Sequence, residues 1–242
     1  MTRRREKQQR WDKERQESQP TRRTVPPKKQ LVQIAPRTAN QKHYLRKLQN
    51  ENIDIVFGIG AAGVGKTYLP CLLAVKMLKE NAIDKVVVTR PAVSVDEEHG
   101  FLPGSLEQKM TPWVRPIFDV FSQYYYAREI EHMIREGVIE IAPLSYMRGR
   151  SFERCFIIAD EIQNATVSQT KMLLTRIGEG SKMVVTGDLN QHDRGFENNG
   201  LSDFVDKLKN SDSKRISVIE FGIEDIQRHP VVAEVLRLYG ED

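Results

Sequence analysis

Residues 53–67 read Ile-Asp-Ile-Val-Phe-Gly-Ile-Gly-Ala-Ala-Gly-Val-Gly-Lys-Thr, and this stretch decides the fold. Its first half is apolar and β-branched, which predicts a buried strand, and the apolar residues of 69–78 recur at helical spacing. Between them, residues 60–67 fit the pattern G-x-x-x-x-G-K-S/T of a phosphate-binding loop, in the strand-to-helix context that the pattern requires. The stretch therefore predicts a nucleotide site at the end of a strand.

Each residue type in this loop has a role in that prediction. Glycines let the backbone fold until successive N–H groups point at phosphate oxygens, and the positive end of the following helix adds to the field. We expect Lys66 to reach the β- and γ-phosphates and the Thr67 hydroxyl to bind Mg²⁺. The predicted contacts of the loop with the nucleotide are Gly60, Ala61, Ala62, Gly63, Val64, Gly65, Lys66 and Thr67. The alternative is a chance glycine-rich turn.

A carboxylate that completes a Mg²⁺ site should follow a neighbouring buried strand. Residues 156–159 form a four-residue apolar run, and Asp160 and Glu161 come directly after it. We expect Asp160 to hold Mg²⁺ through its water shell and Glu161 to polarise the attacking water, which favours hydrolysis over transfer to a small acceptor. Two acids that merely solvate a strand end are the alternative.

A further apolar strand, 182–186, ends in Thr186-Gly-Asp-Leu-Asn-Gln191. In a parallel sheet the carboxyl ends of adjacent strands face the same crevice. Asp188 or Gln191 could therefore sense the γ-phosphate or its attacking water. The alternative is an ordinary Gly-Asp turn that closes the strand.

The rest of the chain alternates in the same way. We expect strands at 85–89, 138–141 and 216–221, and helices at 37–45, 166–178 and 226–239, with a capping box at Thr166 and an end at Gly178. Prolines and glycines in 91–150 should interrupt any long helix. Alternating strands and helices predict an α/β fold with a mostly parallel sheet covered on both faces.

Composition excludes several classes of protein. The chain has 242 residues, 39% of them hydrophobic, and its formal net charge is +4, so disorder throughout, a collagen-like fibre and a disulfide-rich miniprotein are excluded. No apolar run approaches the roughly 20 residues that a membrane-spanning helix needs. The two cysteines, Cys71 and Cys155, have apolar neighbours, so we predict reduced thiols, no membrane association and a cytoplasmic location.

The positive charge is concentrated at the N-terminus. Residues 1–29 hold eleven basic and four acidic residues, with few aliphatic ones and three prolines. We predict a flexible basic tail over 1–30 and one folded domain over 31–242. The tail is either a solvated extension or an arm that adds salt-sensitive affinity for nucleic-acid phosphates.

Together these motifs resemble the PhoH-like family of P-loop ATPases, which is related to superfamily I helicases. The matching segments run in the family's order over about residues 36–239. They are Thr89-Arg-Pro-Ala, Gly100-Phe-Leu-Pro-Gly, residues 139–150, Asp160-Glu-Ile-Gln-Asn, Leu174-Thr-Arg-Ile-Gly, Ser181-Lys-Met-Val-Val-Thr-Gly-Asp and Arg228-His-Pro. Ala61 and Val64 stand where the family usually has proline and threonine, and phosphate contact requires neither side chain.

The resemblance implies a RecA-like core, hydrolysis of Mg-ATP, a hexameric ring and a connection to single-stranded RNA or DNA. It also implies that Gln41 reads the adenine edge, although a surface glutamine on a helix is the alternative. Tyr44 could stack on the base or pack beneath the loop, and we favour packing.

One core of this size lacks the second core that gives arginines to the γ-phosphate in superfamily I helicases. An arginine supplied in trans can raise the rate by roughly 10³–10⁵. We therefore predict a homo-oligomeric ring in which Arg228 or Arg176 completes the neighbour's site. A salt-bridged surface arginine is the alternative for each.

Arginines at strand ends and loops are candidates for nucleic-acid contact. Arg90, Arg148 and Arg150 lie beside apolar or aromatic residues, as in channels that bind phosphates and stack bases. Trp113 and the tyrosines 124–126 could stack bases, but core or interface packing is the favoured interpretation.

Three functions remain open on the sequence alone. The first is an ATP-driven motor or remodeller of single-stranded nucleic acid. The second is a small-molecule phosphotransferase, against which Glu161 beside Asp160 argues. The third is a nucleotide-gated binding or assembly protein with slow ATPase activity and no unwinding.

Overall fold

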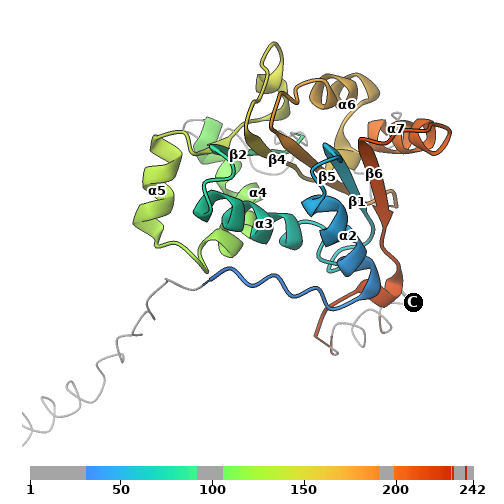
Figure 1. Cartoon of the computed structure of the whole chain (residues 1–242), viewed down its shortest axis with the longest axis horizontal. Coiled ribbons are helices and arrows are strands. Elements are labelled where there is room, and N and C mark those ends of the chain that lie inside the picture. The colour runs from blue at the N-terminus through green and yellow to red at the C-terminus, as the bar shows by residue number, and fades with distance from the viewer. Residues whose placement is uncertain (1–30, 92–105, 191–198, 230, 232–237, 239–242) are drawn as a thin grey trace, which may run out of the picture. The chain divides into compact units, whose positions relative to one another are not determined.

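The computed structural model describes residues 31–91, 106–190, 199–229, 231 and 238, and for 106–113 it describes the backbone alone. The predicted tail, 1–30, lies outside these residues. Six strands and six α-helices make up most of the described part (Figure 1). None of the helices in this part is long and apolar enough to cross a membrane.

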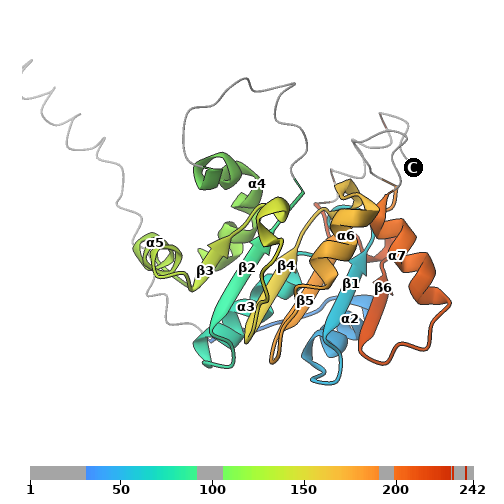
Figure 2. The same cartoon turned by 90° about the horizontal axis from the view of Figure 1, so that it is seen from above.

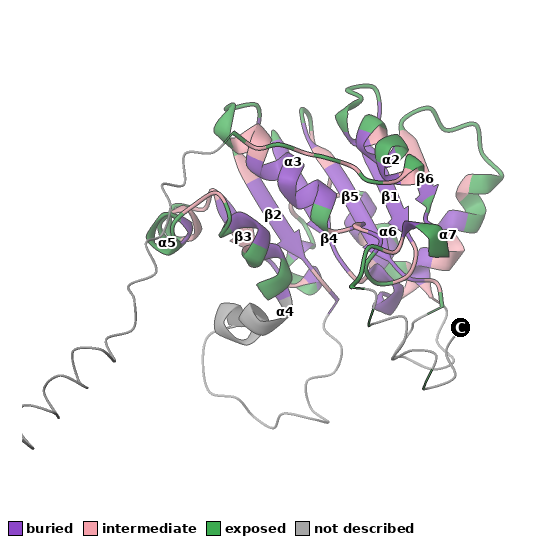
Figure 3. Cartoon of the chain, turned by 90° about the horizontal axis from the view of Figure 1, so that it is seen from below, coloured by how far each residue is buried: buried purple, intermediate pink, exposed green. Residues whose placement is uncertain are grey.

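The six strands form one parallel sheet in the order β3-β2-β4-β5-β1-β6, which Figure 2 shows from left to right. Their bounds are β1 Ile55–Ile59, β2 Lys85–Thr89, β3 Ile139–Ile141, β4 Cys155–Ala159, β5 Lys182–Gly187 and β6 Ile216–Glu220. Strands β1 and β4 are buried along their whole length, and β2 and β5 are buried after their first residue (Figure 3), as expected where helices cover both faces of a parallel sheet.

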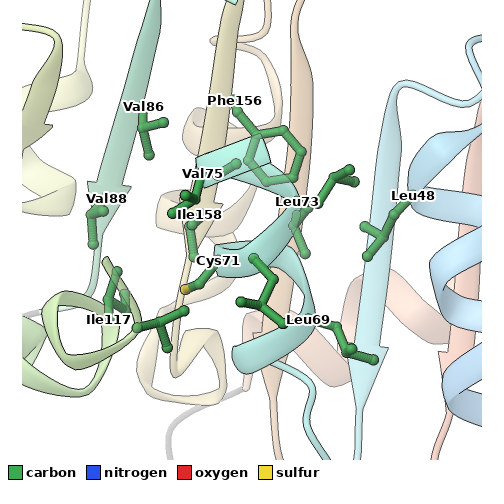
Figure 4. Close-up of a cluster of buried hydrophobic side chains, with 14 of the residues drawn as sticks. Leu48, Leu69, Cys71, Leu73, Val75, Val86, Val88, Ile117, Phe156 and Ile158 are labelled. Atoms are coloured by element: carbon green, nitrogen blue, oxygen red, sulfur yellow. The ribbon is translucent and has the colours of Figure 1, made fainter. Parts of the chain in front are cut away.

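Alternate residues of each strand feed two separate cores. On one face Val86, Val88, Phe156 and Ile158 pack against the helix that follows the phosphate-loop motif, as Figure 4 shows. The residues between them face a second cluster on the other side of the sheet, with Val87 and Ile157 among its members. The period of two residues in a strand is the reason that one run of apolar residues serves both faces.

Six helices cover these two faces. Their bounds are α2 Ala39–Gln49, α3 Tyr68–Lys79, α4 Leu106–Phe121, α5 Ala127–Arg135, α6 Val167–Leu174 and α7 Gly200–Lys209. The first four contribute to the core that α3 shares, whereas α6 and α7 contribute to the other (Figures 1 and 2). Three short 3-10 turns follow strands: Leu144–Met147, Ile162–Asn164 and Ile223–Asp225.

The predicted fold class is confirmed, as are all six strands to within two residues at each end. The expectation that prolines interrupt 91–150 is wrong for its middle, because α4 has 16 residues and contains Pro112 and Pro116. Val114, Ile117, Val120 and Phe121 of α4 are buried at helical spacing. The burial of this apolar face offsets the hydrogen bonds that proline cannot donate.

Three predicted helices differ from the structure in their bounds. The helix expected at 37–45 runs from Ala39 to Gln49. The helix expected at 166–178 has the predicted capping box of Thr166 and Gln169, but it ends at Leu174. Gly178 is instead a packing position, where an added Cβ would lie 2.6 Å from the carbonyl oxygen of Phe152. The helix expected at 226–239 does not begin at Ile226, since residues 226–229 are irregular, and most of the remainder lies outside the described residues.

Candidate nucleotide site

The phosphate loop joins the carboxyl end of β1 to the first turn of α3. Gly63 and Gly65 have φ angles of +91° and +86°, which L side chains rarely adopt, so these glycines are required by the turn. The Lys66 side chain is only 7% exposed, and its Nζ donates to the carbonyl oxygen of Ala61 at 3.2 Å. The ammonium thus crosses its own loop, at the position where a nucleotide phosphate would enter.

Two side chains of α2 brace this loop from behind. The Tyr44 hydroxyl donates to the carbonyl oxygen of Lys66 at 3.0 Å, and the Gln41 Nε2 donates to the carbonyl oxygen of Val64 at 2.9 Å. Burial raises the pKa of Tyr44 well above its ordinary value, and Cys71 and Asp160 add to the shift, so the phenol remains a donor. The predicted packing of Tyr44 beneath the loop is confirmed.

Gln41 has a second bond that bears on its predicted role. Its Oε1 accepts a hydrogen bond from the backbone N–H of Arg37 at 2.8 Å. Both ends of the amide are therefore bound to the protein backbone in this structure, although Gln41 lines the same pocket as Lys66. The structure assigns Gln41 a bracing contact, and adenine reading by Gln41 stays a prediction.

The loop and the acid pair converge on one point, as the sequence predicts. Thr67 Oγ1 donates to Asp160 Oδ1 at 2.8 Å, and Thr186 Oγ1 from β5 donates to the same oxygen. Asp160 is 8% exposed and Thr186 is fully buried, so the carboxylate is fixed by two hydroxyls with little water around it. Three adjacent strand ends thus meet at this carboxylate.

These residues fit a magnesium ion. Mg²⁺ in nucleotide sites takes one or two protein oxygens and completes its shell with phosphates and water. Thr67 and Asp160 supply a hydroxyl and a carboxylate in contact with each other. Within the described residues no group of three or more His, Cys, Asp and Glu could hold a metal ion.

A cavity of about 780 Å³ opens in front of these groups. Its lining includes Lys66, Thr67, Asp160, Glu161 and Arg90. Ligand sites of roughly 300–1,000 Å³ are typical of cofactors and nucleotides. The cavity therefore has the size and the polar groups for a nucleoside triphosphate.

Glu161 has an unusual backbone conformation beside the buried carboxylate. Its φ is 55°, in the left-handed region that a non-glycine residue rarely occupies. Its Oε2 accepts a hydrogen bond from Gln163 Nε2 at 2.6 Å. The side chain is thus held at the cavity, where the sequence places the group that polarises water.

The segment after β6 is docked against both α2 and the phosphate loop. Asp225 is 1% exposed and accepts hydrogen bonds from Thr38 Oγ1, Asn40 Nδ2 and the backbone N–H of Gly222. Two residues later, the backbone N–H of Gln227 donates to the carbonyl oxygen of Gly63 at 3.0 Å. Asp225 therefore fastens the segment that carries the predicted finger Arg228.

The two predicted fingers lie in different surroundings. Arg228 is exposed, and its side chain lies so close to the loop that a Cβ at Gly63 would be 2.8 Å from its Nε. Arg176 donates instead to the carbonyl oxygens of Met172 and Arg150 and to Thr175 Oγ1. Arg228 lies at the loop of its own chain, whereas Arg176 joins α6 to the 144–150 loop.

The three arginines predicted to bind nucleic acid are not gathered at one place. Arg90 lines the cavity, and Arg148 is exposed on the loop after β3. Arg150 forms a bidentate pair with Glu140 and lies 4.5 Å over the Phe152 ring. Hydrogen bonding to Arg150 lowers the pKa of Glu140, so both groups stay charged and the guanidinium is engaged within the chain.

The remaining candidate residues are the predicted γ-phosphate sensor and the aromatic side chains that could stack bases. Gln191 lies outside the described residues, as does the side chain of Trp113. Tyr124 and Tyr125 pack against the core of α3 and α4, which confirms the packing interpretation for both, and Tyr126 is 43% exposed.

Three site residues were not predicted from sequence. Thr186 binds Asp160, Gln163 binds Glu161, and Asp225 fastens the segment beside the loop. Their signals exist: Thr186 ends a buried strand, and Gln163 follows Glu161 by two residues. The partners of Thr186 and Asp225, however, lie on other segments of the chain, and the sheet order is needed to bring the end of β5 beside the end of β4.

The chain is similar in sequence to proteins of one known family. The family model described as PhoH-like protein matches residues 33–240. PhoH-like proteins of Bacillus subtilis (strain 168) and Synechocystis sp. are 45% and 41% identical over 210 and 207 residues, and Protein PhoH of Escherichia coli (strain K12) is 38% identical over 211. The matches cover 86%, 85% and 86% of this chain and 64%, 62% and 58% of those relatives.

Two solved structures have lower similarity. The SWI2/SNF2 ATPase core of Sulfolobus solfataricus in complex with dsDNA has a TM-score of 0.41 and 16% identity, with 65% of this chain and 34% of that chain covered. The Pif1 helicase from Candida albicans has a TM-score of 0.37 and 14% identity, with coverage of 78% and 40%.

Proposed function

The chain belongs to the PhoH-like family, and from that premise we propose that it binds Mg-ATP and hydrolyses the terminal phosphate with water. The observation that carries the proposal is the 2.8 Å hydrogen bond between Thr67 of the phosphate loop and Asp160 at the end of β4. It brings together the two halves of a triphosphate site that are 93 residues apart in the chain. The chain spans about three fifths of the length of its curated relatives, so activity is proposed for this chain alone.

The residues divide the chemistry among them. Lys66 and the N–H groups of the loop bind the phosphates, while Thr67 and Asp160 hold Mg²⁺. Bound Mg²⁺ supplies charge that offsets the negative charge on the phosphate oxygens. Glu161 orients the attacking water and accepts its proton, because it is the carboxylate that lines the cavity directly after Asp160.

Arg228 adds a positive charge at the same loop. Its position beside Gly63 supports a role at the site of its own chain, whereas the sequence predicts a role at a neighbour's site. Mixing Lys66→Ala subunits with Arg228→Ala subunits separates the two. Recovered turnover in the mixture would support action in trans, and no recovery would support action within one chain.

We propose further that the chain forms a homo-oligomeric ring, of hexameric size, and couples hydrolysis to single-stranded RNA or DNA. The family resemblance supports both statements, and exposed Arg148 with Arg90 at the cavity supports contact with phosphates. Arg150 gives less support, since Glu140 already pairs with it.

One experiment tests the proposal in parts. Phosphate release is measured without polymer, with single-stranded RNA and with single-stranded DNA, and the native mass is determined in the same buffer. We expect a polymer-stimulated rate that falls as salt rises, because phosphate contacts release counterions. Glu161→Gln should retain bound ATP and hydrolyse it far more slowly than the wild type, and a wild-type protein that retains no adenine nucleotide would overturn the proposal.

A strand-displacement assay decides between a motor and the alternative of a nucleotide-gated assembly protein. Displacement that requires ATP supports the motor. Slow hydrolysis without displacement supports the alternative, in which ATP hydrolysis sets when a partner is released or assembled.

A further inference from the structure

Gln163 is a buried residue between two strand ends of the candidate site. It is 4% exposed and belongs to the short turn Ile162–Asn164 that follows Glu161. Its side chain does not contact the phosphate loop in any hydrogen bond of the described residues. It connects instead the acid pair after β4 with the residues after β5.

The amide of Gln163 is used at both ends. Its Nε2 donates to Glu161 Oε2 at 2.6 Å, and its Oε1 accepts from the backbone N–H of Asp188 at 3.2 Å. The backbone N–H can only donate, so the oxygen of the amide must face Asp188 and the nitrogen must face Glu161. The network therefore fixes the orientation of the amide without ambiguity.

The space around the amide is closed. A Cβ added at Gly187 would lie 2.8 Å from Gln163 Oε1, so the amide fits only against a glycine at the end of β5. Ile162 and Asn164, on either side in the sequence, are buried as well. Packing thus holds the side chain in one position, which is what precise orientation of a neighbouring group requires.

We propose that Gln163 is a positioning residue that orients the Glu161 carboxylate toward the attacking water and links it to the end of β5. The inference rests on the proposed hydrolysis of ATP. It extends that function, because Gln163 then connects the residues after β5 to Glu161, the group proposed to activate water. Asp188 takes part on that side, since its Oδ1 accepts the backbone N–H of Asn190 at 3.0 Å.

Two substitutions test whether Gln163 is a positioning residue. Gln163→Glu keeps an acceptor for the N–H of Asp188 and removes the donor to Glu161, whereas Gln163→Met removes both. We expect kcat to fall roughly 10–100-fold in both variants, the usual effect of losing an outer-shell partner. The nucleotide Kd should stay within about twofold, because neither bond contacts the phosphate loop.

A purely structural role would give a different pattern. Gln163→Met would then lose thermal stability without a selective loss of kcat, and its effect would not depend on Glu161. Gln163→Glu is not used for this distinction, because it places a second carboxyl group, at a buried position, beside Glu161. The matched control is Gln169→Ala, another glutamine whose Oε1 accepts a backbone N–H, that of Thr166, at a helix start away from the cavity. We expect its kcat to equal that of the wild type.

A double-mutant cycle with Glu161→Gln completes the test, with single-turnover hydrolysis as the readout. If Gln163 acts through Glu161, Gln163→Met should add almost nothing to the loss caused by Glu161→Gln. Full additivity, or wild-type kcat in Gln163→Met, would overturn the inference. If Gln163→Glu does not fold, Gln163→Met and the cycle decide alone.

The same series keeps the inference separate from the function on which it rests. A wild type that does not hydrolyse ATP would overturn both. Wild-type hydrolysis that depends on Glu161 but not on Gln163 would overturn the inference and leave the proposed function intact.

Discussion

The two ends of the sheet are built from the same strands and carry opposite kinds of polar group. At the carboxyl end Asp160, Thr186 and Asp188 are buried. Thr186 donates a hydrogen bond to Asp160, and the backbone N–H of Asp188 donates to Gln163, in the turn after Asp160. At the amino end several polar groups form ion pairs at the surface, such as exposed Asp84 with exposed Arg154, and half-buried Asp54 with exposed Arg215. Buried polar groups must all be hydrogen-bonded, and this requirement fixes their geometry. Exposed ion pairs do not fix the geometry of their side chains and add little to the free energy of unfolding.

The contrast teaches where this fold places its chemistry. Side chains at the carboxyl end are held by hydrogen bonds to one another, beside the cavity that is proposed to bind the nucleotide. At the amino end the partly buried Lys182 donates to the carbonyl oxygen of Asn50 at 2.7 Å, and this bond joins the start of β5 to the end of α2. Substitutions should therefore change activity at one end and only stability at the other.

The largest effect is expected for Lys66→Ala. Loss of a preorganised positive donor at the phosphates should lower the hydrolysis rate by roughly 10²–10³-fold and weaken nucleotide binding. Lys182→Met, a lysine removed from the amino end of β5, should leave the rate unchanged. Phosphate release from the two variants under the same conditions checks the comparison, and equal losses would contradict it.

The next largest effect is expected for Asp225→Ala at the carboxyl end. The change leaves Thr38, Asn40 and the N–H of Gly222 without their acceptor. We expect a loss of about 1–3 kcal/mol in the free energy of unfolding, measured by urea denaturation. Because this segment carries Arg228, kcat should fall as well, and an unchanged kcat would show that Arg228 takes no part.

The same residue predicts a pH dependence. Burial alone raises the pKa of Asp225, but hydrogen bonds from Thr38, Asn40 and Gly222 lower it overall from the ordinary value of 3.8. The stability that this carboxylate contributes is therefore complete above about pH 3.8 and is lost as the pH falls through its lower pKa in the folded state. Thermal melts of the wild type and Asp225→Asn should converge in acid, and parallel curves would contradict this.

A smaller effect, in the alkaline range, is expected at the amino end. Burial lowers the pKa of Lys182 from 10.5 to about 8. Between these values the unfolded chain binds more protons, so the contribution of Lys182 to stability rises with pH from about 8 to 10.5. The Tm of Lys182→Met relative to the wild type should fall over that range, and a constant difference would contradict the assignment.

The smallest effect is expected for Arg154→Ala. Its partner Asp84 is exposed, and hydrogen bonding to Arg154 lowers the pKa of Asp84 without burying either group. Exposed pairs of this kind contribute little that can be measured. Neither Tm nor the hydrolysis rate should change beyond error, and a clear loss of either would show that the amino end is less passive than its exposure indicates.

The sequence predicts those site residues that belong to one short, continuous motif. The phosphate loop follows β1 directly and Asp160-Glu161 follows β4 directly, so the local pattern and the rule for strand ends are sufficient to place both. The contacts of Gln163 with Asp188 and of Asp225 with Thr38 were missed, because they join segments 25 and 187 residues apart. The prolines of α4 argue against a helix in the sequence, whereas the structure forms the helix because it buries an apolar face.

The left-handed backbone of Glu161 has a consequence for how this protein would change under selection. A glycine at that position would relieve the strain of roughly 1–2 kcal/mol that an L side chain bears there, and it would also delete the carboxylate. If variants of this protein were selected for thermal stability alone, glycine should accordingly become frequent at position 161, and those variants should be inactive.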